Sequence, residues 1–359
     1  MSDVTLASRR DAVSVRAAIL PALSVALVGG VVLALLIGPS LFGPLEVARA
    51  LAAGLGLVDP AVVDTMTLRV VLDLRLPRAI MAAGVGAMLA AGGALMQGLF
   101  RNPLADPGLI GVSSGAALAA AAFIVFGGAL VGHAGSLHYL AMPLVSFCGG
   151  LLAVTIVRRL SIRDGRTDVA TMLLAGTAVN SVVFAGIGLL TVISDDAQLR
   201  SITFWSLGSL GGAGWGSVAI VVPVSLIAVA AGLLGARVLD GMMLGEVEAY
   251  CLGFRVETTK RALVLLVAAG VGAAVSFTGL IGFVGIIAPH IARVVLGPMH
   301  RQLLIGSSLT GALLLVLADT LCRVVIAPAE LPIGVVTSLI GAPVFIALLL
   351  GRHRRAFRC

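Results

Sequence analysis

The chain has 359 residues, of which 59% are hydrophobic and only 11% are charged, and its mean hydropathy is +1.13. A soluble domain carries roughly 25% charged residues, so this composition excludes an ordinary water-soluble protein and predicts an integral membrane protein. The net charge of +7 could suggest a nucleic-acid partner. The basic residues stand in short clusters between apolar runs, however, where they set orientation in a membrane. We therefore expect membrane lipid around the chain and no nucleic acid.

Ten stretches of the chain are long and apolar enough to cross a membrane as helices. A helix that crosses about 30 Å of hydrocarbon needs about 20 mostly apolar residues. The 45 glycines suit helices that pack closely through small residues in lipid. We predict an all-α polytopic membrane protein with ten transmembrane helices, although residues 261–297 could be divided differently. The predicted spans are residues 17–37, 79–99, 108–128, 140–158, 168–193, 216–238, 261–278, 280–297, 303–323 and 334–350.

The distribution of Lys and Arg predicts how the spans are oriented, because cytoplasmic loops of membrane proteins carry an excess of these residues. If ten spans alternate from a cytoplasmic N-terminus, eighteen of the 24 Lys and Arg residues are cytoplasmic and six are outside. An odd number of spans would spoil this asymmetry. We therefore expect a multi-pass protein of the bacterial inner membrane with both termini in the cytoplasm. The first span is longer than the apolar core of a signal peptide, so we expect it to remain uncleaved.

The chain is predicted to form one membrane domain with short flanking segments. A cytoplasmic segment covers residues 1–16, a single transmembrane domain covers residues 17–350, and a basic cytoplasmic tail covers residues 351–359. The outer connection at residues 38–78 contains amphipathic pieces, which we expect to be short helices near the membrane surface. The longest inner loop, residues 239–260, is predicted to hold two short helices joined by a turn, with Glu246 near the start of the second, where the helix dipole favours an acid.

Motifs for enzymatic chemistry are missing from the sequence. Lys260 is the only lysine, so a G-x-x-x-x-G-K-[ST] phosphate loop cannot exist and the chain alone is not expected to hydrolyse ATP. The cysteines are scattered, and we expect no metal site and no permanently bound cofactor. His133 and His138, on the predicted outer side, could reach a haem iron, although histidines in loops are usually solvated.

Asp319 is the one acid placed clearly within a predicted span. Ionised residues within the membrane are costly and mark functional sites by default. Arg323 lies four residues further along the same predicted helix, a spacing that allows a local ion pair. A structural ion pair and a proton relay both remain open. The relay would make the protein an ion-coupled secondary transporter.

Several long segments resemble the FecCD family, the permease subunits of type II ABC importers that take up vitamin B12, ferric siderophores and haem. The resemblance implies a ten-helix subunit that forms a homodimer, binds two ATPase subunits that hold the ATP, and receives substrate from a periplasmic binding protein. The matching segments are RLPRAIMAAGVGAMLAAGGALMQGLFRNPLADPGLIGVSSGAA (75–117), LLAGTAVN (173–180), GEVEAYCLG (245–253), GLIGFVGIIAPHIAR (279–293) and ADTLCRVVIAPAELPIGVVTSLIGAPVF (318–345).

The resemblance assigns docking of the binding protein to Arg75, Arg78 and Arg323, which match family positions that form basic pockets for acidic residues. Arginine forks pair well with carboxylates, and such pairs would fix the pose of the partner. The predicted orientation places all three arginines outside, as docking requires. The alternative is that they only anchor helix ends among the lipid headgroups.

The resemblance also assigns the inner loop to the coupling helices, which sit in a cleft of the ATPase subunit. Small and apolar residues at helical spacing would form this contact. The alternative is a plain amphipathic loop. The matching coupling residues are Gly245, Glu246, Ala249, Leu252 and Gly253.

By the same resemblance, the substrate path follows the dimer axis and is lined mainly by the fifth span. Thr177, Asn180 and Ser181 are polar positions in this otherwise apolar helix, and they either line the path or bond to carbonyls of their own helix. The inner gate is expected near the start of the span. The gate residues are Val169, Ala170 and Thr171.

The segment at residues 173–215 is most similar to haem-importing members of the family, so haem is the expected substrate. Arg200 follows the fifth span at the outer mouth, and two copies across the dimer axis could attract the two propionates of haem. Permeases for siderophores and vitamin B12 can carry a basic residue nearby, so both substrates remain alternatives.

Overall fold

The structure is a computed structural model that describes residues 2–40, 42–131, 138–163 and 165–356. These residues form fourteen α-helices, two very short strands and three other helical turns. The helices are α1 (Ser2–Leu36), α2 (Pro44–Gly54), α3 (Thr65–Leu68), α4 (Leu76–Phe100), α5 (Val112–Val131), α6 (His138–Leu160), α7 (Val169–Ile193), α8 (Asp196–Leu207), α9 (Trp215–Met242), α10 (Glu246–Cys251), α11 (Val256–Thr278), α12 (Val284–Leu296), α13 (His300–Val324) and α14 (Ile333–Ala356). The strands β1 (Ile162–Arg163) and β2 (Arg166–Thr167) pair antiparallel, and the turns are η1 (Pro60–Val62), η2 (Arg69–Arg75) and η3 (Pro107–Ile110).

Each of the ten predicted spans coincides with a helix, which confirms the all-α polytopic fold class. Among the described residues, seven helical stretches are long and apolar enough to cross a membrane. Three shorter apolar stretches complete the set, Val112–Gly127, Val284–Leu296 and Ile333–Ala347. At 1.5 Å per residue, α12 is only about 20 Å long. It is therefore too short to cross the hydrocarbon core alone and needs the irregular segment before it.

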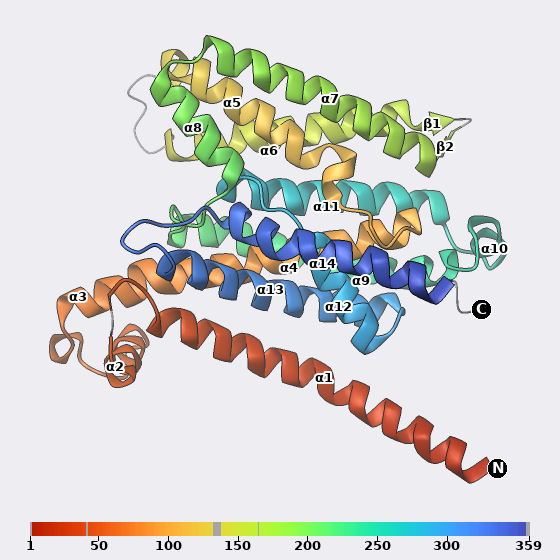
Figure 1. Cartoon of the computed structure of the whole chain (residues 1–359), viewed down its shortest axis with the longest axis horizontal. Helices are drawn as coiled ribbons and strands as arrows, with labels where there is room; N and C mark the ends of the chain where they lie inside the picture. Colours follow the sequence, from red (N-terminus) through yellow and green to blue (C-terminus); the bar gives the residue numbers. More distant parts are fainter. Residues whose placement is uncertain (1, 41, 132–137, 164, 357–359) are drawn as a thin grey trace.

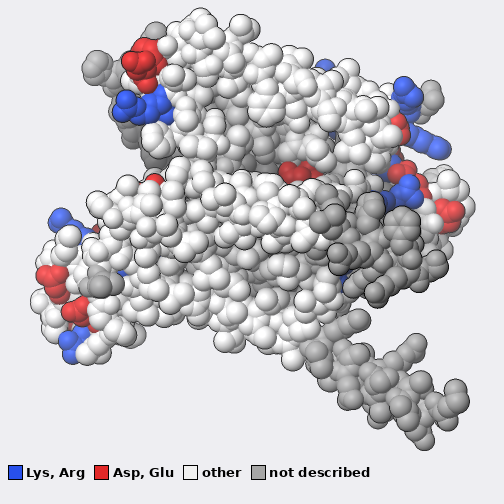
Figure 2. All heavy atoms as spheres, viewed as in Figure 1, with Lys and Arg blue, Asp and Glu red and all other residues white. Residues whose placement is uncertain are grey.

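The long helices lie side by side and leave two distinct ends (Figure 1). We name these the hairpin end, which carries α10, β1 and β2, and the α8 end, which carries α2, α3 and α8. On the face that Figure 2 shows, charged side chains gather at both ends, and the surface between them is almost free of charge apart from one acidic group near its middle. This distribution fits a bundle whose middle faces hydrocarbon, where a charge would cost several kcal/mol.

Helix α4 forms the centre of the bundle and packs against α13, α9, α12 and α11. Two close approaches depend on glycine. A Cβ atom on Gly86 would lie 2.3 Å from the carbonyl oxygen of Gly311 on α13, and one on Gly93 would lie 1.8 Å from that of Gly285 on α12. Real Cβ atoms do not approach so closely, so the missing side chains let the backbones touch. This packing confirms the close helix association expected from the glycine content.

The outer connection differs from the prediction at its second half. Helix α2 is one of the expected short helices, and its start is capped by Glu46, whose carboxylate accepts a hydrogen bond from the Gly43 N–H (2.8 Å). From Thr65 onward, however, the chain is helical without a break to Phe100, so the predicted span at 79–99 starts too late. Pro77 lies near the start of α4. Here the π-helical turn η2 precedes it, and such a turn accommodates the hydrogen bond that proline cannot donate.

The inner loop also differs from the prediction. Residues 239–242 continue α9, so only one short helix, α10, lies between α9 and α11. The expectation of two short helices is therefore wrong, although Glu246 does begin a helix, directly after Gly245 with φ of 137°. The small β-hairpin between α6 and α7 was not predicted, because two paired residues in each strand leave almost no pattern in a sequence.

The contact between α4 and α13 gives a first prediction. Gly86→Ala should lower the stability of the detergent-solubilised protein by about 1–3 kcal/mol, because the new methyl group overlaps the Gly311 carbonyl. Thermal unfolding followed by size-exclusion chromatography measures this loss. Gly29→Ala on α1 is the control, since a Cβ atom there has nothing within 4 Å. Equal stability of the two variants would contradict the close packing.

Candidate functional site

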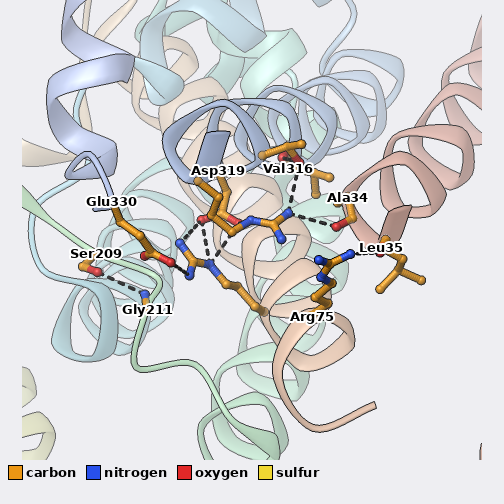
Figure 3. A network of polar contacts seen from close by, with 11 residues as sticks. Ala34, Leu35, Arg75, Ser209, Gly211, Val316, Asp319 and Glu330 are labelled. Atoms are coloured by element: carbon orange, nitrogen blue, oxygen red, sulfur yellow. Dashed lines mark hydrogen bonds and ion pairs between the residues drawn. The ribbon is translucent and has the colours of Figure 1, made fainter. Parts of the chain in front are cut away.

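A buried cluster of charged residues lies at the α8 end, between α4, α13 and the turn before α14 (Figure 3). Arg78 on α4 is its centre. Its Nε donates to both carboxylate oxygens of Asp319 (3.0 Å each), and its Nη2 donates to Asp319 Oδ1 (2.8 Å). Its Nη1 donates to Glu330 Oε1 (2.9 Å). One guanidinium thus binds a buried and a partly exposed carboxylate, since the Asp319 side chain is 2% exposed and that of Glu330 is 41% exposed.

Arg323 completes the cluster from the other side of Asp319. Its Nε lies 3.3 Å from Asp319 Oδ2, and its Nη2 donates to the Ala34 carbonyl at the end of α1 (3.0 Å). The structure therefore contains the local Asp319–Arg323 ion pair that the spacing allowed. Sequence reasoning missed Arg78 and Glu330 as further members, because Arg78 lies 241 residues before Asp319 and no short-range spacing connects them.

Arg75 lies one turn before Arg78 but binds different partners. Its Nη1 donates to the Leu35 carbonyl (2.6 Å), its Nη2 donates to the Ser40 carbonyl, and its guanidinium lies over the Phe42 ring at 5.0 Å. It ties the end of α1 to the start of α4. Arg75 and Arg323 are each 5% exposed. Of the three arginines assigned to docking, Arg323 binds Asp319 from within and Arg75 binds the end of α1, whereas Arg78 lies closest to the surface.

The predicted inner gate, Val169 to Thr171, forms the first turn of α7 at the hairpin end. Asp168 caps this turn and accepts hydrogen bonds from the hydroxyl and the backbone N–H of Thr171, the latter at 3.0 Å. These bonds hold the pKa of Asp168 below its ordinary value. Ala170 is exposed, and Val169 and Thr171 are half-buried. The start of the helix is therefore well defined and partly open to the surroundings.

The three polar residues of α7 that are proposed for the substrate path separate into two kinds. Thr177 and Ser181 are exposed, and their hydroxyls donate to carbonyls of their own helix, those of Leu174 (2.8 Å) and Thr177 (3.0 Å). Asn180 points instead toward α5 and η3. It accepts from Ser114 and donates to the Gly108 carbonyl (3.3 Å). Asn180 thus fixes α7 to the bundle, and only Thr177 and Ser181 belong to the exposed face.

The exposed face of α7 is otherwise apolar and extensive. Only 17% of its span is buried in the single chain, against 78% for the span that contains α4. Such a face needs either lipid or another protein against it. Its most exposed large side chains are Leu174, Val182, Leu189 and Val192.

The structure gives fewer contacts for the remaining residues that were proposed to bind the substrate. Arg200 is exposed on α8, directly beyond the end of α7. His133 lies outside the described residues, and His138 begins α6 with a side chain that is also outside them. Within the described part of the chain, no three His, Cys, Asp or Glu residues are grouped as metal ligands.

Helix α10 protrudes at the hairpin end with apolar side chains on its outer face. Val247 and Tyr250 are 71% and 72% exposed, and Leu252, just after the helix, is 61% exposed. Ala249 is fully buried and packs α10 onto the bundle. Beside the helix lies a groove of about 740 Å³ that is lined by Tyr250, Arg166 and the start of α11. A short helix that displays apolar side chains in this way is suited to a groove on a partner protein.

The comparisons with known proteins agree with this arrangement. The model of the FecCD transport family matches residues 25–351. The hemin transport system permease protein HmuU of Yersinia pestis is 47% identical over 79% of this chain and 84% of its own length. The cobalamin import system permease protein BtuC of Halobacterium salinarum is 42% identical over 79% of this chain and 74% of its own length. The Fe(3+) dicitrate transport system permease protein FecD of Escherichia coli is 37% identical over 78% of this chain and 85% of its own length.

A solved structure gives the same result for the fold. A metal-chelate type ABC transporter in an inward-facing conformation superposes with a TM-score of 0.79 at 31% identity, covering 93% of this chain and 99% of that chain. The family match, the relatives and the fold together identify the chain, which belongs to the FecCD transport family.

Proposed function

We propose that this chain is the transmembrane permease subunit of an ABC importer that passes haem from a periplasmic binding protein to the cytoplasm. The observation that carries the proposal is the 47% identity to the hemin permease HmuU over 79% of the chain. The chain has no phosphate loop, because its single lysine, Lys260, stands in ETTKRA. It is therefore not itself an enzyme, and the energy for transport must come from ATPase subunits.

In this proposal, α10 couples the permease to an ATPase subunit. Gly245 and Gly253, with φ of 137° and 85°, turn the chain at the two ends of α10, and neither conformation suits an L residue with a side chain. The outer face of α10 supplies apolar contacts through Val247, Tyr250 and Leu252. Ala249 is buried against the bundle, so a movement of α10 is transmitted to the bundle through this contact. Glu246 joins α10 to the residues below it through a salt bridge with Lys260.

A second copy of the chain covers the exposed face of α7 in the proposed homodimer. The substrate path then follows the axis between two α7 helices, with Thr177 and Ser181 as its polar positions and Val169 to Thr171 as the inner gate. Transport is by alternating access. Binding and hydrolysis of ATP move α10, α7 tilts, and the open end of the path changes from the outer to the inner side.

The hairpin end lies in the cytoplasm in this proposal, and the protein resides in a bacterial inner membrane with both termini inside. The excess of Lys and Arg in the segments assigned to the cytoplasm supports this orientation. The α8 end then faces the binding protein. Arg78 is the docking residue that a partner carboxylate can reach, since its side chain is 12% exposed and its partner Glu330 is 41% exposed. Arg200 attracts the propionates of haem at the outer mouth.

Ferric siderophores and vitamin B12 are the alternative substrates, and the similarity to FecD and BtuC supports keeping both. An ion-coupled secondary transporter is the alternative of a different class. It would use Asp319 as a proton carrier. The place of Asp319 between the guanidinium groups of Arg78 and Arg323 favours a structural role instead.

Uptake into vesicles tests the proposed function directly. Proteoliposomes that contain this chain with its cognate ATPase should accumulate haem when the binding protein and ATP are both present. Vitamin B12 and a ferric siderophore, offered under the same conditions, serve as the comparison substrates. Accumulation of either of these in place of haem would correct the substrate. ATP-independent uptake that is lost in Asp319→Asn would instead favour the secondary transporter.

Docking at Arg78 predicts a loss of affinity in a mild variant. Arg78→Lys keeps the positive charge beside Asp319 but loses the arginine fork, so the binding protein should bind about tenfold more weakly. Surface plasmon resonance on the permease–ATPase complex in nanodiscs measures the affinity. Arg69→Lys, an exposed arginine on the same helical run, is the control. Unchanged affinity of Arg78→Lys would remove Arg78 from the docking site.

The proposed dimer predicts cross-linking through α7. Val182→Cys should give a covalent dimer with a bismaleimide in membranes, because the α7 helices of the two copies face one another. Val25→Cys on α1 should not, although both valines are 72% exposed in the single chain. The background for both variants replaces Cys148, Cys251 and Cys359 by serine. Cross-linking at position 25 and not at position 182 would place the interface elsewhere.

A further inference from the structure

A polar network lies directly beneath α10 at the hairpin end, and Lys260 is its centre. This residue, in the second turn of α11, is 2% exposed. Its Nζ donates to Glu246 Oε2 on α10 (2.6 Å) and to the carbonyl oxygen of Thr167 at the end of β2 (3.2 Å). An ammonium group has three donors on a compact charge, so it can hold acceptors from two separate segments. Lys260 thus joins α10 to the β-hairpin.

Further bonds clamp the hairpin onto α11. Glu257 accepts from the backbone N–H of Thr167 (3.1 Å) and from its hydroxyl (2.6 Å). Arg261 donates to Glu257 Oε1 (2.9 Å) and to the Gly165 carbonyl (2.9 Å). One turn of α11 therefore holds the end of the hairpin through the carboxylate of Glu257 and the guanidinium group of Arg261.

The hairpin leads into α7 with no intervening loop. Thr167 is followed directly by Asp168, whose N–H donates to the Ser161 carbonyl (3.0 Å) and whose carboxylate caps the first turn of α7. Glu246, Lys260, Thr167 and Asp168 form a continuous path of bonds. This path runs from the exposed helix α10 to the residues at the start of α7.

We propose that Lys260 is a positioning residue that makes the start of α7 follow the movement of α10. The inference rests on the proposed function, in which α10 contacts the ATPase and α7 forms the gate. Its physical basis is burial. A buried ammonium that lost Glu246 would be left with an uncompensated charge, and one that lost the Thr167 carbonyl would be left with an unpaired donor. Both states are unfavourable at a buried position. The low-energy movement is therefore one in which α10 and the hairpin move together.

The amount of haem transported per ATP hydrolysed tests this role in the full transporter. Lys260→Met keeps the length of the side chain but removes the charge and the donors, so this ratio should fall by about tenfold. Lys260→Arg keeps the charge and the donors, so this variant should retain most of the wild-type ratio. Arg237→Met is the control, because it removes an exposed cation from α9 at the same end and should leave the ratio unchanged.

A second variant addresses the same path from α10. Glu246→Gln removes the carboxylate charge that Lys260 binds, and it should lower the ratio in the same direction. Because the two residues act through one bond, the double variant should be no worse than Lys260→Met alone. Additive losses would mean that the two residues act independently.

The outcomes separate this inference from the proposed function. If the wild-type transporter carries no haem, the proposed function fails first. If it carries haem and both Lys260→Met and Glu246→Gln keep the wild-type ratio, the permease function stands and the role of Lys260 is wrong. If Lys260→Met no longer co-purifies with the ATPase while Glu246→Gln does so with a normal ratio, Lys260 only stabilises the fold, and the inference is also overturned.

Discussion

A charge buried in this bundle must find its partners within the same chain, because neither lipid nor apolar helices can supply them. Both ends of the molecule are organised by this constraint. At the α8 end, Asp319 lies between Arg78 and Arg323 and joins α4 to α13. At the hairpin end, Lys260 joins α10 and the hairpin to α11. Elsewhere, the long helices pack mainly through apolar contacts, with single polar contacts such as those of Asn180.

The two clusters differ in how open they are to a partner. Asp319 is 2% exposed and bound from two sides, so it acts as a fixed clamp. In each cluster one carboxylate lies nearer the surface, Glu330 at 41% exposure and Glu246 at 36%. These two carboxylates bind a buried cation and can still be reached from outside. Each end therefore has a point where a docking protein can influence a buried network without entering the bundle.

The sequence predicted the features that depend on local spacing. Runs of about 20 apolar residues located all ten helices, and the four-residue spacing suggested the Asp319–Arg323 pair. It failed where a helix continues beyond its apolar run, as at Thr65 before α4 and at residues 239–242 of α9. Hydropathy marks the membrane-embedded part of a helix, whereas hydrogen bonds decide where the helix ends.

Contacts between distant segments could not be predicted from the sequence, because they do not depend on local spacing. The partnership of Arg78 with Asp319 depends on how α4 crosses α13, and that crossing is set by Gly86 and Gly311. The path from α10 to the hairpin needs α11 between them, which no pattern in a single sequence reports. The orientation of Asn180 is a further case. Helical spacing placed it beside Thr177 and Ser181, but a half-buried amide needs partners, and it found them on Ser114 and Gly108.

The distribution of packing also indicates which helix is free to move. Helix α4 is enclosed and has interlocked glycine contacts on two sides, so a shift there would disturb the whole core. Helix α7 has only 17% of its span buried in the single chain, so few contacts with its own bundle oppose a tilt of this helix. It comes close to the bundle at Gly176, where a Cβ atom would lie 1.9 Å from the Leu109 carbonyl, one turn before Asn180. If Lys260 draws the start of α7 along with α10, this contact is the point about which α7 would tilt. A small displacement at the hairpin end would then move the opposite end of the helix, beside α8, the other way.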